Sequence, residues 1–296
     1  MPGHLVQPLL AAALLALAST ALHRRLPPRL ASNHIAAVMV ILVIAAVPTV
    51  VLVSLTYLAH VPFFGSTLQW CSHALGHHRE VPVWLGVTCT VLLAAGTVRC
   101  VRVVSSYRRM SCSRPAPLAV ADDDTPFAIT LPGPGGRIVV SAGLIQALDP
   151  HETEVVIAHE QAHAALRHDR YLLLGALVTA FLPPLAWLSS RLTFSLERWA
   201  DETAADRCGD RRLVAATLGK VALIDRTDRP PMVGFAGAAG FAGLGVAARV
   251  RLLLRPPVPN PDEKWVVALA VTVGAAAAFA AFQVHHVEPL IHFLCH

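Results

Sequence analysis

Two histidines and a glutamate with a spacing suited to metal chemistry lie near the middle of the chain. His159, Glu160 and His163 read H-E-x-x-H, and residues i and i+4 of an α-helix lie on one face. Two imidazoles in this arrangement can share a Zn²⁺ ion, while the glutamate between them can act as a general base toward water. The pattern therefore predicts hydrolysis assisted by one catalytic Zn²⁺ ion.

A helix-start signal precedes this motif. Asp149, Pro150 and Glu152 fit the N-cap, N1 and N3 positions of a capping box. The residues that follow give the helix an apolar side: Val155, Val156, Ala158, Ala162 and Leu166. We expect the two histidines at the edge of that side. The alternative is a helix whose histidines are only surface or hydrogen-bonded core residues.

A third metal ligand must come from elsewhere, because catalytic zinc usually has three protein ligands and one open position. An acidic cluster spans residues 197–202, and within it Glu197 and Asp201 are i and i+4. We expect Glu197 to be a ligand and Asp201 to accept the second N–H of a ligating histidine. The alternative is a solvated, charged helix face on which Glu197, Arg198 and Asp201 form ion pairs.

Three motifs taken together resemble a known family. They are the H-E-x-x-H at 159–163, the apolar F-L-P-P-L-A-W at 181–187, and the E-x-x-A-D that begins at Glu197. This order resembles the BlaR/MecR-type integral-membrane zinc metallopeptidases, which are gluzincins related to the HtpX-type and CaaX prenyl-type proteases. The resemblance covers residues 120–260 in motif and implies a zincin-like α+β domain.

The resemblance also assigns roles, residue by residue. It implies His159, His163 and Glu197 as zinc ligands, Glu160 as the catalytic base and Asp201 as a supporting carboxylate. No residue type or spacing singles out substrate-binding side chains or a donor to the oxyanion.

Short β runs and irregular segments surround the motif. Runs at 127–131 and 137–141 flank a P-G-P-G-G turn and resemble the hairpin that precedes the zinc helix in this family. An exposed edge of this hairpin could pair with a substrate backbone. Residues 105–124 are typical of a linker, and the Gly-rich segment 228–245 precedes a short predicted helix at 246–254.

The composition indicates a polytopic membrane protein. Mean hydropathy is +0.56, with 55% hydrophobic and 15% charged residues, which lies outside the range of soluble domains. Apolar runs long enough to cross a bilayer occupy 5–22, 35–58, 81–98 and 265–284. We therefore expect a mainly α fold with three membrane helices in residues 1–104, a cytoplasmic metallopeptidase domain at 105–264, and a fourth membrane helix in 265–296.

Basic residues predict the orientation. Arginines follow the first and third runs, whereas the loop at 59–80 holds only Arg79, so the positive-inside rule places both termini outside and 105–264 inside. A fifth apolar stretch, 171–190, would carry Glu197 to the opposite side from His159 if it crossed. Pro183 and Pro184 interrupt it, so we expect a helical hairpin that lies against the membrane without crossing.

The net charge and the positions of the cysteines indicate which kinds of binding partner and covalent link to expect. A net charge of +5 suits contact with anionic membrane lipid, and no basic patch interleaved with aromatics indicates nucleic acid. The orientation places Cys71 and Cys295 outside, where they could form a disulfide. Outside histidines, which could bind a metal, sense pH or be unrelated, are His60, His73, His77, His78, His285, His286, His292 and His296.

These patterns predict a membrane-embedded zinc endopeptidase that cleaves a protein or peptide substrate at the cytoplasmic face of the plasma membrane. The chain ends 12 residues after its last apolar run, so we expect no extracellular penicillin-binding sensor. The resemblance favours regulatory cleavage of a repressor-like protein. The alternatives are an HtpX-like quality-control protease for membrane proteins and a non-enzymatic membrane metal-binding or sensor protein.

Overall fold

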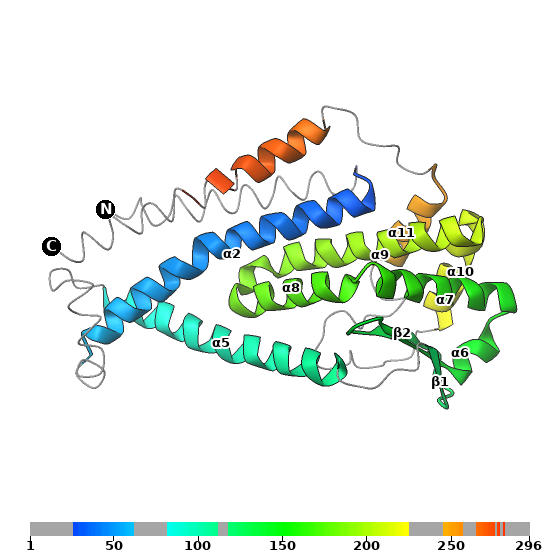
Figure 1. Cartoon of the computed structure of the whole chain (residues 1–296), viewed down its shortest axis with the longest axis horizontal. Helices are drawn as coiled ribbons and strands as arrows, with labels where there is room; N and C mark the ends of the chain where they lie inside the picture. Colours follow the sequence, from blue (N-terminus) through cyan, green and yellow to red (C-terminus); the bar gives the residue numbers. More distant parts are fainter. Residues whose placement is uncertain are drawn as a thin grey trace.

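Long apolar helices, a small sheet and several shorter helices make up the described part of the chain in its computed structural model (Figure 1). The structure describes residues 26–61, 82–111, 118–224, 245–256, 265–275, 277, 278 and 281. Outside these residues lie the first predicted span at 5–22, almost all of the Gly-rich segment, Cys71 and Cys295, and every predicted outer histidine except His60. His60 Nδ1 lies 2.7 Å from the Thr56 carbonyl oxygen of its own helix.

Within the described residues, two helices are long and apolar enough to cross a membrane. They are α2 (Pro28–Ala59) and α5 (Val83–Ser111), whose most apolar windows have mean hydropathies of 3.0 and 1.7. They coincide with the predicted spans 35–58 and 81–98, and each is longer than predicted. Of the last predicted span, 265–284, the helix Trp265–Ala275 is described. It lies near α2, where Thr272 Oγ1 is 3.3 Å from His34 Nε2.

The prediction of a linker at 105–124 is wrong for most of the residues that the structure describes there. Helix α5 continues to Ser111, and residues 118–121 form strand β1 (Leu118–Ala121). Tyr107 in the last turns of α5 donates a hydrogen bond of 2.7 Å to Asp169 Oδ2. This contact with a segment 62 residues away gives the polar end of the helix a packing partner, which the local composition does not reveal.

A three-stranded sheet lies beside the motif helix. Strands β2 (Ala128–Leu131) and β3 (Arg137–Ser141) pair antiparallel and confirm the predicted hairpin. Strand β1 pairs parallel with β3, with Leu118 opposite Ile138, so the strand order is β1-β3-β2. The third strand was not predicted, because four residues gain their stability from pairing with a distant strand.

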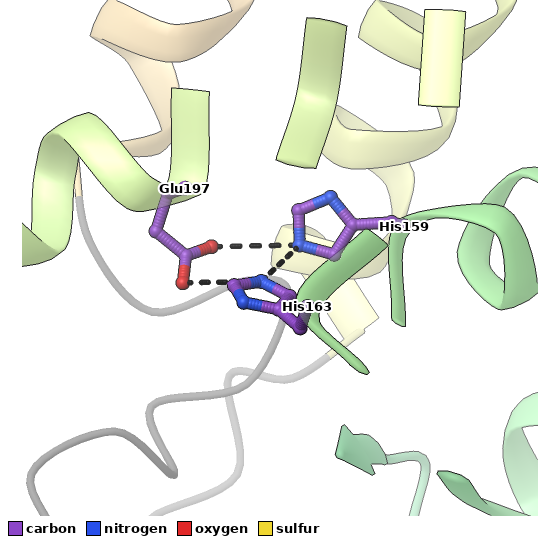
Figure 2. Close-up of side chains that lie close together, drawn as sticks. All are labelled: His159, His163 and Glu197. Atoms are coloured by element: carbon purple, nitrogen blue, oxygen red, sulfur yellow. Dashed lines mark hydrogen bonds and ion pairs between the residues drawn. The ribbon is translucent and has the colours of Figure 1, made fainter. Parts of the chain in front are cut away.

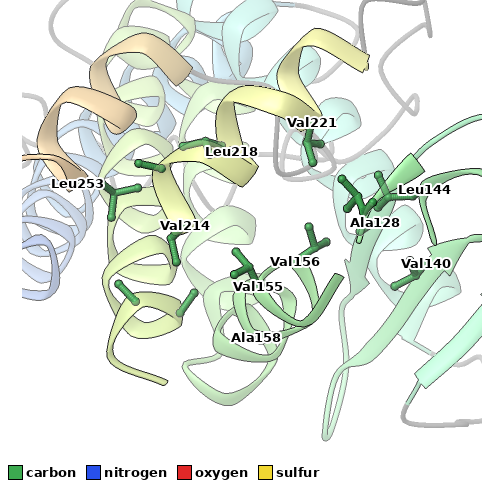
Figure 3. Close-up of a cluster of buried hydrophobic side chains, with 14 of the residues drawn as sticks. Ala128, Val140, Leu144, Val155, Val156, Ala158, Val214, Leu218, Val221 and Leu253 are labelled. Carbon is green, nitrogen blue, oxygen red and sulfur yellow. The ribbon is translucent and has the colours of Figure 1, made fainter. Parts of the chain in front are cut away.

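The motif helix α7 (Pro150–Ala165) begins at the predicted capping box. The Asp149 carboxylate accepts a hydrogen bond from the Glu152 backbone N–H, and the Glu152 carboxylate accepts one from the Asp149 N–H, both at 2.9 Å. Val155, Val156 and Ala158 of α7 are buried in a core shared with the sheet, α6 (Ala142–Ala147), α10 (Arg211–Ile224) and α11 (Val246–Leu253) (Figure 3). The predicted apolar side and the helix at 246–254 are thus confirmed.

The apolar stretch at 171–190 folds as two helices that reverse direction. Helix α8 (His168–Phe181) ends before the 3₁₀ turn η1 (Pro183–Leu185), and α9 (Ala186–Cys208) then returns alongside α8 (Figure 1). Proline lacks a backbone N–H and cannot continue a helix. A second core, which includes Ile35 and Val38, packs α2 against α8 and α9. The helical hairpin is present, and its position relative to a membrane stays a prediction.

Gly143 provides a test of the packing between α6 and the loop before β2. A Cβ atom at Gly143 would lie 1.9 Å from the Asp124 carbonyl oxygen, whereas a Cβ at Gly219 in α10 would meet no atom within 4 Å. We expect Gly143→Ala to lower the free energy of unfolding by about 1–3 kcal/mol and Gly219→Ala to raise it by about 0.5–1 kcal/mol. Thermal unfolding of both variants in detergent measures this, and equal midpoints would contradict the packing.

Candidate metal centre

Helix α7 directs two imidazoles toward the same point. His159 and His163 are one helical turn apart, and their Nε2 atoms lie 3.1 Å from each other. His159 is fully buried, and His163 retains 12% of its side-chain exposure. Two ring nitrogens that face each other at this distance either share a proton or bind a common cation.

Helix α9 brings a carboxylate to the same point. Glu197 Oε2 lies 3.6 Å from His159 Nε2, and Glu197 Oε1 lies 3.6 Å from His163 Nε2 (Figure 2). Ligand atoms about 2.0–2.1 Å from a tetrahedral zinc ion are separated by about 3.3 Å. The donor set of two imidazoles and one carboxylate, with separations of 3.1–3.6 Å, fits a catalytic zinc site. The structure thus brings together the three residues that the sequence analysis expected as ligands.

Glu160 lies on the sheet side of α7. It is 3% exposed, and its Oε2 accepts a hydrogen bond of 2.7 Å from Thr130 Oγ1 on β2. Thr130 also donates to the Glu160 carbonyl oxygen at 2.9 Å, so one strand residue holds both the backbone and the side chain of Glu160. Burial raises the pKa of the Glu160 carboxyl, which suits a group that must accept and release a proton.

Asp201 lies behind His159. Its Oδ1 is 3.1 Å from His159 Nδ1, the ring nitrogen opposite the one that faces Glu197. A carboxylate in this position fixes the ring orientation and favours a proton on Nδ1, which leaves Nε2 available to a metal. Glu197, Arg198 and Asp201 are 5%, 3% and 1% exposed, so the alternative of a solvated charged face is excluded.

Arg249 on α11 is a member of this cluster that the sequence analysis missed. Its guanidinium is fully buried and donates two hydrogen bonds to Asp201, from Nε at 2.8 Å and from Nη2 at 2.7 Å. Arg249 Nη1 lies 3.0 Å from Glu197 Oε2. Arg249 is 48 residues from Asp201 and has two further arginines nearby, Arg251 and Arg255. Only its burial distinguishes it from them.

The electrostatics of the cluster favour a cation next to Glu197. Burial lowers the pKa of His159, but the carboxylates of Asp201 and Glu197 outweigh burial and raise this pKa to about 9. Burial opposes ionisation of Glu197 and Asp201, yet Arg249 and His159 hold the pKa of each carboxyl below its usual value. Both carboxylates are therefore ionised, so a negatively charged Glu197 faces the two Nε2 atoms.

The Arg249 ion pairs can be tested by removing their cation. We expect Arg249→Met to lower the free energy of unfolding by about 3–5 kcal/mol, because two carboxylates would lose their buried partner. Arg251→Met is the matched control, since Arg251 lies on the same helix and is exposed. Denaturant unfolding in detergent compares the two variants, and equal loss of stability in both would contradict the assigned role of Arg249.

Comparison with known proteins finds one family whose model matches the part of the chain that contains His159 and His163. Residues 107–193 match the model of peptidase family M48, a stretch that includes the sheet, α7, α8 and the first turns of α9. No curated protein and no solved structure matches the chain. The match covers less than half of the chain and ends before Glu197. It supports a metallopeptidase function and does not distinguish the BlaR/MecR type from the HtpX type.

Proposed function

We propose that the chain is a membrane-embedded zinc endopeptidase that hydrolyses peptide bonds at the cytoplasmic membrane face. His159, His163 and Glu197 hold one Zn²⁺ ion, and Glu160 is the general base. The observation that carries the proposal is the meeting of two Nε2 atoms and a carboxylate at separations of 3.1–3.6 Å. The match to peptidase family M48 across α7 supports the same reaction.

Each residue around the proposed zinc ion has a separate role in peptide hydrolysis. When bound, Zn²⁺ supplies Lewis-acid chemistry that polarises a carbonyl group and makes water acidic near neutral pH. Glu160 takes the proton from the attacking water and returns it to the leaving amine. Thr130 holds the Glu160 carboxylate, while Asp201 keeps the His159 ring in the orientation that exposes Nε2.

Strand β2 is the element best placed to align a substrate. Among the residues that the structure describes, β2 pairs with β3 on one side and with no strand on the other, because the strand order is β1-β3-β2. Thr130 connects β2 directly to Glu160. An extended peptide that adds to the free edge of β2 would have its backbone held by main-chain hydrogen bonds. This arrangement would present successive peptide bonds of the substrate to Glu160. We therefore propose that the substrate peptide binds along the edge of β2.

Membrane embedding is supported by the length and the outward faces of α2 and α5. Helix α5 exposes a row of large apolar side chains that includes Val83, Trp84, Val87, Val91 and Val98. Exposure of such a row to water is unfavourable, whereas lipid tails would cover it. We propose four membrane helices with both termini outside. The reversal at η1 supports a site that stays on one side of the membrane, because Glu197 returns to His159 without a crossing.

Regulatory cleavage of a cytoplasmic repressor-like protein is the substrate role that we propose, on the strength of the resemblance to BlaR/MecR-type receptors. An HtpX-like quality-control protease is the second candidate, and the match to family M48 favours it equally. A non-enzymatic metal sensor would have no need of Glu160. The buried Glu160 carboxylate and its hydrogen bond from Thr130 therefore weigh against a non-enzymatic function.

Glu160→Gln tests the proposed reaction. The variant keeps the shape of the side chain and all three zinc ligands but cannot accept a proton. We expect it to retain one zinc ion per chain and to lose proteolysis by at least about 10²-fold. Metal analysis and cleavage of an unfolded protein in detergent measure the two properties. Glu154→Gln, an exposed position on the same helix, is the control, and full activity in Glu160→Gln would refute the mechanism.

The same variant can identify the substrate class. We expect Glu160→Gln, expressed in its native membrane and treated with a cross-linker, to retain one dominant soluble protein. The control carries His163→Ala in addition and lacks a zinc ligand, so it should retain less of that protein. A broad set of membrane proteins retained by Glu160→Gln would contradict regulatory cleavage and support the quality-control function.

A further inference from the structure

A third histidine lies directly against His163 and has no role in the mechanism above. His168 is the first residue of α8, is fully buried, and places its Nδ1 atom 2.9 Å from His163 Nδ1. His163 Nε2 points the other way, toward His159 and Glu197. The two ring nitrogens of His163 thus face different partners. Nε2 faces the metal position, and Nδ1 faces His168.

Tautomers follow from this geometry. A histidine that binds a metal through Nε2 carries its proton on Nδ1 and needs an acceptor for it. The acceptor that faces His163 Nδ1 is His168 Nδ1, which is then unprotonated. An unprotonated ring nitrogen carries a lone pair, so His168 Nδ1 can accept this hydrogen bond.

We infer that His168 is the positioning residue for His163: its Nδ1 accepts the His163 Nδ1–H, which orients the ring and directs Nε2 to the zinc ion. The inference rests on the proposed metal site and adds a residue to it. His159 has its own positioning group in Asp201. One ligand is therefore held by a carboxylate and the other by a neutral imidazole.

The surroundings of His168 hold its ring in place. The ring contacts Trp199 at a centroid distance of 5.1 Å and Tyr171 at 6.4 Å. Trp199 lies two residues after Glu197 on α9, so one helix provides both a ligand and part of the wall around His168. Within the described part of the chain His168 Nε2 has no hydrogen-bond partner, which leaves the contact with His163 as the polar interaction of this ring.

The backbone just before His168 has an unfavourable conformation that allows His168 to contact His163. Arg167, the residue between α7 and α8, has a φ of 55° and is the one described non-glycine residue with a positive φ. A left-handed conformation costs a residue with a side chain about 1–2 kcal/mol, and such strain often accompanies functional positions. This turn brings His168 back against α7, only five residues after His163.

Three substitutions separate an acceptor role from simple packing. Asn places its amide oxygen near the position of Nδ1, Gln places it near the position of Nε2, and Leu fills the space without an acceptor. The measurement is the zinc dissociation constant of the detergent-solubilised full chain, from competition with a fluorescent chelator. We expect His168→Leu and His168→Gln to weaken zinc binding by about 10–100-fold and His168→Asn to stay close to wild type.

Other results would overturn the inference. Unchanged zinc binding in His168→Leu, or equal weakening in His168→Asn and His168→Leu, would show that an acceptor at Nδ1 is not needed. Unfolding midpoints of the metal-free variants control for stability, and if His168→Leu does not fold, the Asn and Gln variants decide. Absence of zinc binding in the wild-type chain would instead contradict the proposed function, so the two failures are distinguishable.

Discussion

Burial of charge is the constraint on which the site depends. Glu197 and Asp201 are 5% and 1% exposed, and the guanidinium of Arg249 is fully buried between them. An unpaired ion in such surroundings costs several kcal/mol. The carboxylates can therefore remain ionised beside His159 only if α11 docks on α9 and delivers Arg249. Helix α11 is thus part of the site although it carries none of the proposed ligands.

The path of the chain between α7 and α9 brings Glu197 back to the two histidines. Glu197 lies 34 residues after His163 in the sequence, and an uninterrupted apolar helix would carry it far from α7. The turn at η1 reverses the chain, so α9 runs back beside α8 and returns the carboxylate to the histidines. A glycine allows α8 and α9 to pack closely after this reversal, because a Cβ atom at Gly175 would lie 2.6 Å from Ser189 Oγ.

Contacts also run without a break from the apolar helix α2 to the metal position. Tyr171 donates a hydrogen bond of 2.6 Å to Asn33 on α2, its ring contacts His168, and His168 contacts His163. Helix α2 packs on both α8 and α9 through apolar side chains. The orientation of a proposed zinc ligand is thereby connected to the packing of a helix long enough to cross a membrane, and the same rigid scaffold holds both.

Local patterns in the sequence determined the parts of the protein that depend on neighbours a few residues apart. The H-E-x-x-H spacing, the Asp149 capping box, the hairpin of β2 and β3 and the break at Pro183 all depend on residues close together in the sequence, so they could be predicted. The candidate ligand Glu197 and its neighbour Asp201 followed from spacing and family resemblance. Only the tertiary structure decided how β1, His168 and Arg249 are placed. Strand β1 and Arg249 contact residues far away in the sequence, and His168 reaches His163 through the left-handed turn at Arg167, which no sequence pattern indicated.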